Sequence, residues 1–212
     1  MQRMLKNQGK EVINMAHTVK NFDRLIGLDG FSEKLLKQHF SLYQGYCNKL
    51  NEIEEKLSTA DRTTANYSFG EFSELKRRET VAFNGTYLHE LYFENLGPTL
   101  LTPDGALSEA LKRDFGTLQA WEKDMRACAL STPGWVLLTH NWVDSKLHHY
   151  ILYEHHIGLP VHQKPLLAID CWEHAFMLDY GTAKAEYLNA FFKNLNWNVV
   201  EDRFARVLKH LK

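Results

Sequence analysis

The stretch that most restricts the fold lies between Ser32 and Leu57, where apolar side chains recur every three or four residues. This spacing predicts a long amphipathic helix with one buried face, and Ser32 suits its N-cap. The buried face comprises Leu35, Leu36, His39, Phe40, Tyr43, Tyr46, Cys47, Leu50, Ile53 and Leu57. A second helical pattern runs from about Phe69 to Leu96, with a candidate break near Asn84-Gly85. Two long helices joined by a short polar segment predict an antiparallel helical hairpin.

The chain changes character after Gly97–Ala106, a segment with two prolines and two glycines that we take as the domain boundary. Two shorter helices are predicted next, at about 107–114 and 118–129. The period then becomes typical of strands. Trp135–Trp142 and Leu147–Tyr153 predict a hairpin, Leu166–Ile169 predicts a third short strand, and the helical pattern returns from Glu173.

This order of elements predicts an α+β fold. We expect residues 1–15 to be a flexible tail, residues 16–98 to form the N-terminal antiparallel helical hairpin domain, and residues 104–212 to form a C-terminal α/β domain with a three-stranded antiparallel sheet.

Composition excludes several classes of protein. The 25 Lys and Arg residues nearly cancel the 26 Asp and Glu residues, so the net charge is −1 and nucleic acid is not expected as a partner. No apolar run reaches the roughly 18–20 residues that span a bilayer, and the N-terminus has no hydrophobic signal core, so we expect no membrane partner. Three cysteines stand far apart without a CxxC pair. This usage predicts reduced thiols and a cytoplasmic protein.

Two histidines and one aspartate–histidine pair point to a metal site. Asp170 and His174 are four residues apart at a predicted strand–helix junction, where one helical turn would place both side chains together. His39 and His89 fall on the apolar faces of the two long helices. A single histidine on such a face is more often a hydrogen-bonded core residue. Three histidines with one aspartate nevertheless form a mixed nitrogen–oxygen set that suits iron or manganese, and zinc also fits it.

Five segments of the sequence resemble the iron/manganese superoxide dismutase family. The most specific is PLLAIDCWEHAFMLDYG (165–181), which is close to the family signature D-x-W-E-H-A-Y. The other four are HFSLYQGYCNKLN (39–51), NGTYLHELYFENLGP (84–98), PGWVLL (133–138) and YLNAFFKNLNW (187–197). The resemblance covers residues from about 22 to 204.

The resemblance implies a function and a ligand set. It implies disproportionation of superoxide at one iron or manganese ion per subunit, bound by His39, His89, Asp170 and His174 between the two domains. Of the two metals, we slightly favour iron over manganese as the bound ion.

The resemblance also implies residues that surround the metal. Tyr46 is expected as the tyrosine at the substrate gateway, with Tyr43 as its neighbour, although Tyr46 follows His39 by seven residues where most relatives have eight. Relatives place a glutamine beside the metal-bound solvent. Its two family positions hold Gly85 and His155 here, so His155 is the candidate for that role.

Four further residues take roles from the resemblance. Trp135 and Trp172 match the family's aromatic wall, and Lys184 matches a basic residue that steers superoxide to the site. Glu173 matches the residue that reaches the partner subunit's ligand histidine, which implies a homodimer or a tetramer. The two tyrosines that usually follow the signature are replaced by Phe176 and Met177, so the tyrosine–histidine link between subunits is not implied.

Two other functions stay open at the level of the sequence. One is a non-catalytic, metal-poor structural or binding descendant of the same fold. The other is a metal-dependent oxygenase or hydrolase that uses His39, His89 and Asp170. Four more histidines, His140, His148, His149 and His162, cluster around the predicted hairpin. We expect them at the surface, where such a cluster can bind adventitious zinc or nickel.

Overall fold

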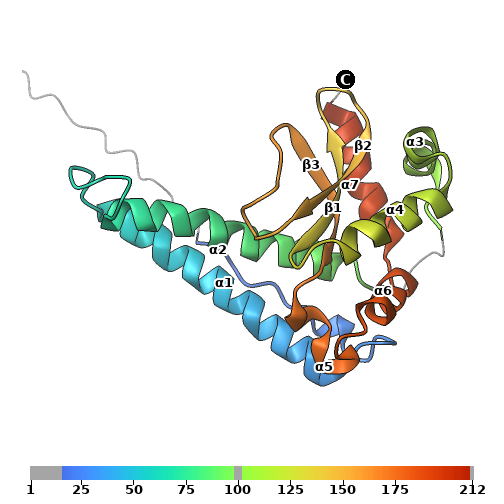
Figure 1. The fold of residues 1–212 in the computed structure, drawn as a ribbon, viewed down its shortest axis with the longest axis horizontal. Helices are drawn as coiled ribbons and strands as arrows, with labels where there is room; N and C mark the ends of the chain where they lie inside the picture. The colour runs from blue at the N-terminus through green and yellow to red at the C-terminus, as the bar shows by residue number, and fades with distance from the viewer. Residues whose placement is uncertain (1–15, 98–101, 211–212) are drawn as a thin grey trace, which may run out of the picture.

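The structure is a computed structural model that describes residues 16–97 and 102–210. Its N-terminal half is a short 3₁₀ turn, η1 (Asp23–Leu25), followed by the helices α1 (Glu33–Thr59) and α2 (Glu71–Glu94), which form a long antiparallel hairpin (Figure 1). The hydroxyl of Ser32 accepts a hydrogen bond from Leu35 N at 3.0 Å, which confirms the predicted N-cap. The candidate break near Asn84-Gly85 is wrong, because α2 continues through both residues.

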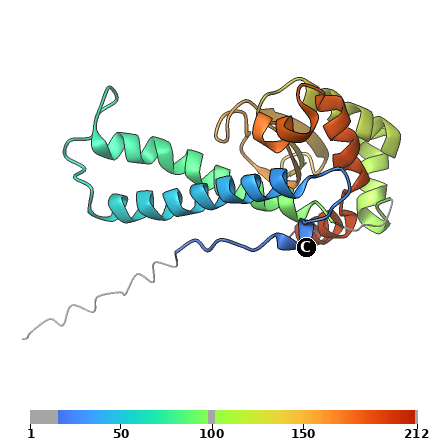
Figure 2. The same cartoon turned by 90° about the horizontal axis from the view of Figure 1, so that it is seen from below.

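The C-terminal half is built on a three-stranded antiparallel sheet in the order β2-β1-β3. Its elements are α3 (Gly105–Phe115), α4 (Leu118–Leu130), β1 (Trp135–Asn141), β2 (Leu147–Leu152), β3 (Gln163–Asp170), η2 (Glu173–Ala175), α5 (Met177–Tyr180), α6 (Lys184–Lys193) and α7 (Trp197–His210). The α+β fold class and the three strands are therefore confirmed. Figure 2 shows the hairpin projecting from the part of the molecule that contains the sheet.

The third strand and the segment after it differ from the sequence prediction. β3 begins at Gln163, three residues before the predicted start at Leu166, because Gln163 and Lys164 pair with the end of β1 despite their polarity. The predicted helix from Glu173 is instead a 3₁₀ turn followed by one turn of α5. Gly181, with φ of 53°, ends α5, since a left-handed backbone favours glycine.

The core lies where the central strand meets the helices. Six of the seven residues of β1 are buried. The hairpin joins the sheet through α2, whose following residue Asn95 donates a side-chain hydrogen bond to Ala168 O in β3 at 3.0 Å. This contact holds the carboxyl end of β3 against the inner part of the hairpin.

The expected tail, residues 1–15, lies outside the described residues. The division into domains 16–98 and 104–212 stays a prediction. No helix in the described residues is both long enough and apolar enough to cross a membrane.

Candidate metal centre

Four side chains from four separate elements meet at the end of β3. His39 comes from α1, His89 from α2, Asp170 from the last position of β3 and His174 from η2. One donor atom from each lies within 4.8 Å of the others. The three Nε2 atoms surround Asp170 Oδ2, at 3.1 Å from His39, 3.1 Å from His174 and 3.5 Å from His89. The structure therefore brings together the four residues predicted as ligands.

Hydrogen bonds to Asp170 hold it at this point. Its Oδ1 accepts a hydrogen bond from Trp172 N at 2.9 Å, and its main-chain carbonyl accepts one from the hydroxyl of Tyr187 at 2.7 Å. The expectation that Asp170 and His174 share one helical turn is wrong. Asp170 ends a strand, and the tight bend at Trp172 brings His174 back beside it in a 3₁₀ turn.

His89 shows that the cluster suits a cation. Its Nδ1 is bonded to Gly85 O, so it carries the ring proton and Nε2 presents a bare lone pair. This Nε2 is fully buried and, among the described residues, has no hydrogen-bond partner. An orphaned buried acceptor beside a carboxylate is costly unless a cation or a solvent donor occupies the space between them. The residues present therefore fit a metal ion.

The electrostatics of the cluster favour the same conclusion. Burial lowers the pKa of His89 to about 3 and lowers that of His39, so both imidazoles are neutral near pH 7. Burial opposes ionisation of Asp170, but the neighbouring imidazoles of His174 and His39 hold its pKa well below the usual range. These neutral imidazoles and the ionised carboxylate are in the forms that bind divalent and trivalent metals. Burial opposes protonation of His174, but the carboxylate of Asp170 raises its pKa, so His174 must release its proton to bind a metal.

A second network lies beside these four residues. The indole Nε1 of Trp135 donates a hydrogen bond to His155 Nδ1 at 2.9 Å, and His155 Nε2 lies 2.7 Å from the hydroxyl of Tyr46. The rings of Tyr46 and Trp135 both contact His89, with centroids 5.5 and 5.0 Å away. Three residues predicted for the surroundings of the metal are therefore connected to each other and to one candidate ligand.

The side chains of the remaining predicted residues make different contacts. Trp172 packs beside His155 with ring centroids 5.8 Å apart. The hydroxyl of Tyr43 points away from the cluster and donates to Glu90 Oε1 at 2.8 Å, although its ring lies 6.4 Å from that of His89. The amine of Lys184 donates to Thr132 O at 2.6 Å.

Glu173 is exposed beside His174, whose side chain is 30% exposed. Together with Gln38, Met177 and Leu178, these two residues line a surface pocket of about 420 Å³. The predicted subunit-linking residue thus lies at an opening to one of the four candidate ligands.

Sequence reasoning missed two residues that position the site. Tyr187 supports the main chain of Asp170 from α6, and Asn84 donates its amide to His155 O at 2.7 Å from α2. Both lie within segments that resemble the family, but nothing in their local spacing indicated contact with β3 or with the loop after β2.

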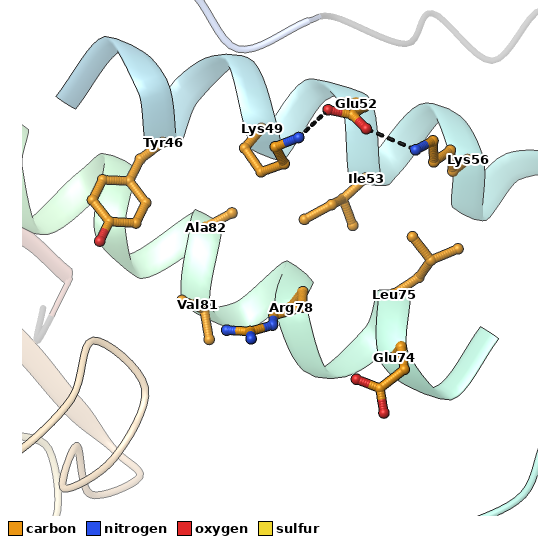
Figure 3. Close-up of a pocket in the computed structure, with 10 residues that line it drawn as sticks. All are labelled: Tyr46, Lys49, Glu52, Ile53, Lys56, Glu74, Leu75, Arg78, Val81 and Ala82. Carbon is orange, nitrogen blue, oxygen red and sulfur yellow. Dashed lines mark hydrogen bonds and ion pairs between the residues drawn. The ribbon is translucent and has the colours of Figure 1, made fainter. Parts of the chain in front are cut away.

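A separate groove runs along the outer part of the hairpin (Figure 3). It is lined by Tyr46, Lys49, Glu52, Ile53, Lys56, Glu74, Leu75, Arg78, Val81 and Ala82 and encloses about 400 Å³. Ion pairs from Lys49 and Lys56 to Glu52 border it on α1. None of the four clustered residues lines this groove, and Tyr46 alone connects it to the network around His155.

The chain is similar to a set of known proteins. Residues 103–203 match the family model described as iron/manganese superoxide dismutases, C-terminal domain. A superoxide dismutase [Fe] of Aquifex aeolicus is 38% identical over 187 residues, which cover 86% of this chain and 88% of that protein. A superoxide dismutase [Fe] of Cupriavidus metallidurans is 37% identical, covering 86% and 92% of the two chains. A superoxide dismutase [Mn] 2 of Haloferax volcanii is 33% identical, covering 84% and 89%.

Proposed function

Because this chain belongs to the iron/manganese superoxide dismutase family, we propose that it disproportionates superoxide into dioxygen and hydrogen peroxide. The observation that carries this proposal is the convergence of three imidazole nitrogens on Asp170 Oδ2, with the Nε2 atom of His89 buried and unpartnered among the described residues. A descendant that had lost its metal would have no reason to keep this buried polar cluster, whose burial is costly without a cation.

The proposed ligands are His39, His89, Asp170 and His174. When bound there, an iron or manganese ion supplies the one-electron oxidation and reduction that convert two superoxide ions and two protons into dioxygen and hydrogen peroxide. Relatives of both kinds, named for iron and for manganese, match this chain.

The network of Trp135, His155 and Tyr46 is proposed to hold a proton beside this centre. An indole N–H only donates, so His155 Nδ1 must accept. Burial lowers the pKa of His155, so the ring is neutral near pH 7 and its one proton lies on Nε2. That proton is donated to the Tyr46 oxygen, which leaves the hydroxyl proton of Tyr46 available to a second acceptor. Trp135 and Trp172 exclude bulk water around His155.

We also propose that the protein acts as a homodimer. The pocket at His174 is bordered by Met177 and Leu178, two apolar residues that are 39% and 44% exposed. A second copy seated here would cover these apolar side chains and place its Glu173 near the His174 of the first. Light scattering of purified protein tests the dimer, and Glu173→Ala should weaken it.

Two further proposals concern location and steering. Cys47, Cys128 and Cys171 are free thiols, which suits the reducing environment of the cytoplasm.

Lys184 is proposed to attract superoxide, and the hydrogen bond to Thr132 O holds its positive charge in a fixed place. Lowering the ionic strength should therefore raise the rate of superoxide removal more in the native protein than in Lys184→Met.

Metal analysis combined with a superoxide-removal assay tests the proposed function. Asp170→Ala and His174→Ala should each lose bound iron or manganese and superoxide removal together. His156→Ala is the matched control, because His156 is an exposed histidine outside the cluster, and it should keep both. Native protein that contains no stoichiometric iron or manganese and removes no superoxide after loading would refute the proposal.

A further inference from the structure

A second group of possible metal ligands lies where α4 packs on β2. Asp124 and Cys128 are one helical turn apart on α4, and His149 faces them from β2. Asp124 Oδ2 lies 2.6 Å from His149 Nδ1, and one donor atom from each of the three residues lies within 4.8 Å of the others. The cluster contains a thiol, an imidazole and a carboxylate.

The position of His149 corrects the expectation from the sequence. His140 and His149 were predicted at the surface with His148 and His162, but His140 is buried and the side chain of His149 is only 2% exposed. The ring of His149 stacks on Phe115 with centroids 4.6 Å apart. This packing fixes the ring with Nδ1 directed toward α4.

His149 can change from one neutral tautomer to the other without breaking a second hydrogen bond. Among the described residues, Nε2 of this ring has no hydrogen-bond partner, and Nδ1 bonds to Asp124. The ring can therefore carry its proton on Nε2 and present the Nδ1 lone pair to a cation held by Asp124 and Cys128. The side chain of Asp124 is 59% exposed, so the cluster is open to ions from solvent.

We propose that Asp124, Cys128 and His149 form a second binding site for a divalent transition-metal ion, of which Zn²⁺ fits best. Zinc accepts mixed sulfur, nitrogen and oxygen ligands in tetrahedral geometry, and water from the exposed side supplies the fourth ligand. Calcium and magnesium are disfavoured because they require several oxygen ligands. The candidate centre at Asp170 contains no sulfur, so the two sites can be distinguished by spectroscopy.

Cobalt is the suitable probe, because Co²⁺ replaces Zn²⁺ and absorbs in the near ultraviolet when bound to a thiolate. The experiment uses full-length protein already loaded with iron or manganese, titrated with Co²⁺ under equilibrium dialysis. One further equivalent should bind with thiolate-to-cobalt absorption. Cys128→Ser should lose this absorption while keeping superoxide removal, and Asp124→Asn should bind about tenfold more weakly. Glu122→Gln is the matched control, because this carboxylate on the same helix pairs with Arg126, and it should behave as the native protein does.

Alkylation of Cys128 provides a readout that needs no cysteine variant. Cys47 and Cys171 are buried, whereas Cys128 is partly exposed. Mass spectrometry measures the rate at which iodoacetamide alkylates Cys128. Zn²⁺ should slow this alkylation by about tenfold in the native protein and much less in Asp124→Asn. Absence of thiolate-to-cobalt absorption, its persistence in Cys128→Ser, or alkylation that is indifferent to Zn²⁺ would each overturn the second site.

Discussion

The hydroxyl of Tyr46 and Nε2 of His155 lie 2.7 Å apart, and the direction of the hydrogen bond between them is determined by a third residue. Because Trp135 donates to Nδ1 of the same imidazole, the neutral ring can only donate to Tyr46. The Trp135 indole thus requires Nε2 of His155 to be the donor, which leaves the hydroxyl proton of Tyr46 available for transfer. The three residues come from β1, α1 and the loop after β2, and they act as one unit beside His89.

Replacing His155 with glutamine tests this network. A glutamine amide can accept from the Trp135 indole through its oxygen and donate to Tyr46 through its nitrogen, so His155→Gln should keep the fold and the bound metal. It removes a group whose pKa burial lowers below the ordinary value of 6.5, so the dependence of superoxide removal on pH should change on the acid side. The measurement is the rate of superoxide removal from about pH 5 to pH 9 at equal metal content.

His155→Leu is the control for this substitution, because it keeps most of the volume and neither hydrogen bond. It should lower the rate more than His155→Gln does. A glutamine variant that fails to fold would show that the histidine is needed for structure, and identical pH profiles in native and glutamine proteins would contradict a role in proton supply.

Substitutions at the two tyrosines of α1 should affect stability and activity separately. Tyr43 accepts a hydrogen bond from Lys20 N at 3.0 Å and donates to the buried carboxylate of Glu90. Tyr43→Phe should therefore destabilise the protein by about 1–2 kcal/mol in urea unfolding and leave superoxide removal per bound metal unchanged.

Tyr46→Phe should show the reverse behaviour. The hydroxyl of Tyr46 bonds to His155 and its ring is half-buried, so loss of the oxygen should reduce the rate of superoxide removal by about tenfold or more, with less than about 1 kcal/mol lost in stability. If instead Tyr43→Phe lowers the rate and Tyr46→Phe does not, the assignment of the two residues is reversed.

An acidic residue at the end of α2 makes stability depend on pH. Glu94 pairs with Lys20 at 2.9 Å and with Arg203 at 2.7 Å. Burial opposes ionisation of Glu94, but the hydrogen bonds from Lys20 and Arg203 outweigh it and hold the pKa below the ordinary value of 4.5. This contribution to stability is complete above pH 4.5 and is lost as pH falls through the lowered pKa of the folded protein.

Glu94→Gln measures that contribution. At pH 7 the variant should be less stable than the native protein by about 1–2 kcal/mol in urea unfolding, since the pair is partly exposed. The difference should shrink steadily below pH 4.5. A difference that stays constant down to about pH 3 would show that the carboxylate charge is not its origin.

Much of the fold follows from local patterns, whereas the four clustered residues are identified together by the family resemblance, because local spacing wrongly placed Asp170 and His174 in one helical turn. The 3–4 spacing predicts α1 and places His39 on its buried face, and the change to β-branched and aromatic residues predicts β1. The direction of Tyr43 and Tyr46 could not be predicted, because both lie near one face of α1 and their hydroxyl groups bond to residues far apart in the chain, Glu90 on α2 and His155 after β2. His149 was misplaced for a similar reason, since its burial depends on α4 packing over β2.

The close approach of the two long helices depends on Gly85. A Cβ atom at position 85 would lie 2.5 Å from Tyr46 Cδ1, so Gly85→Ala must displace the Tyr46 ring. The expected result is a loss of about 1–3 kcal/mol in stability and a lower rate of superoxide removal, because the hydroxyl of Tyr46 moves away from His155.

Gly45 on α1 provides the matched control for Gly85→Ala. It is also a helical glycine, but nothing lies within 4 Å of the position its Cβ would take. Gly45→Ala should therefore stabilise the protein by about 0.5–1 kcal/mol through helix propensity alone, with no change in rate. Urea unfolding and the superoxide assay on both variants check this. If Gly85→Ala also gains stability and keeps the native rate, the helices can adjust and Gly85 does not position Tyr46.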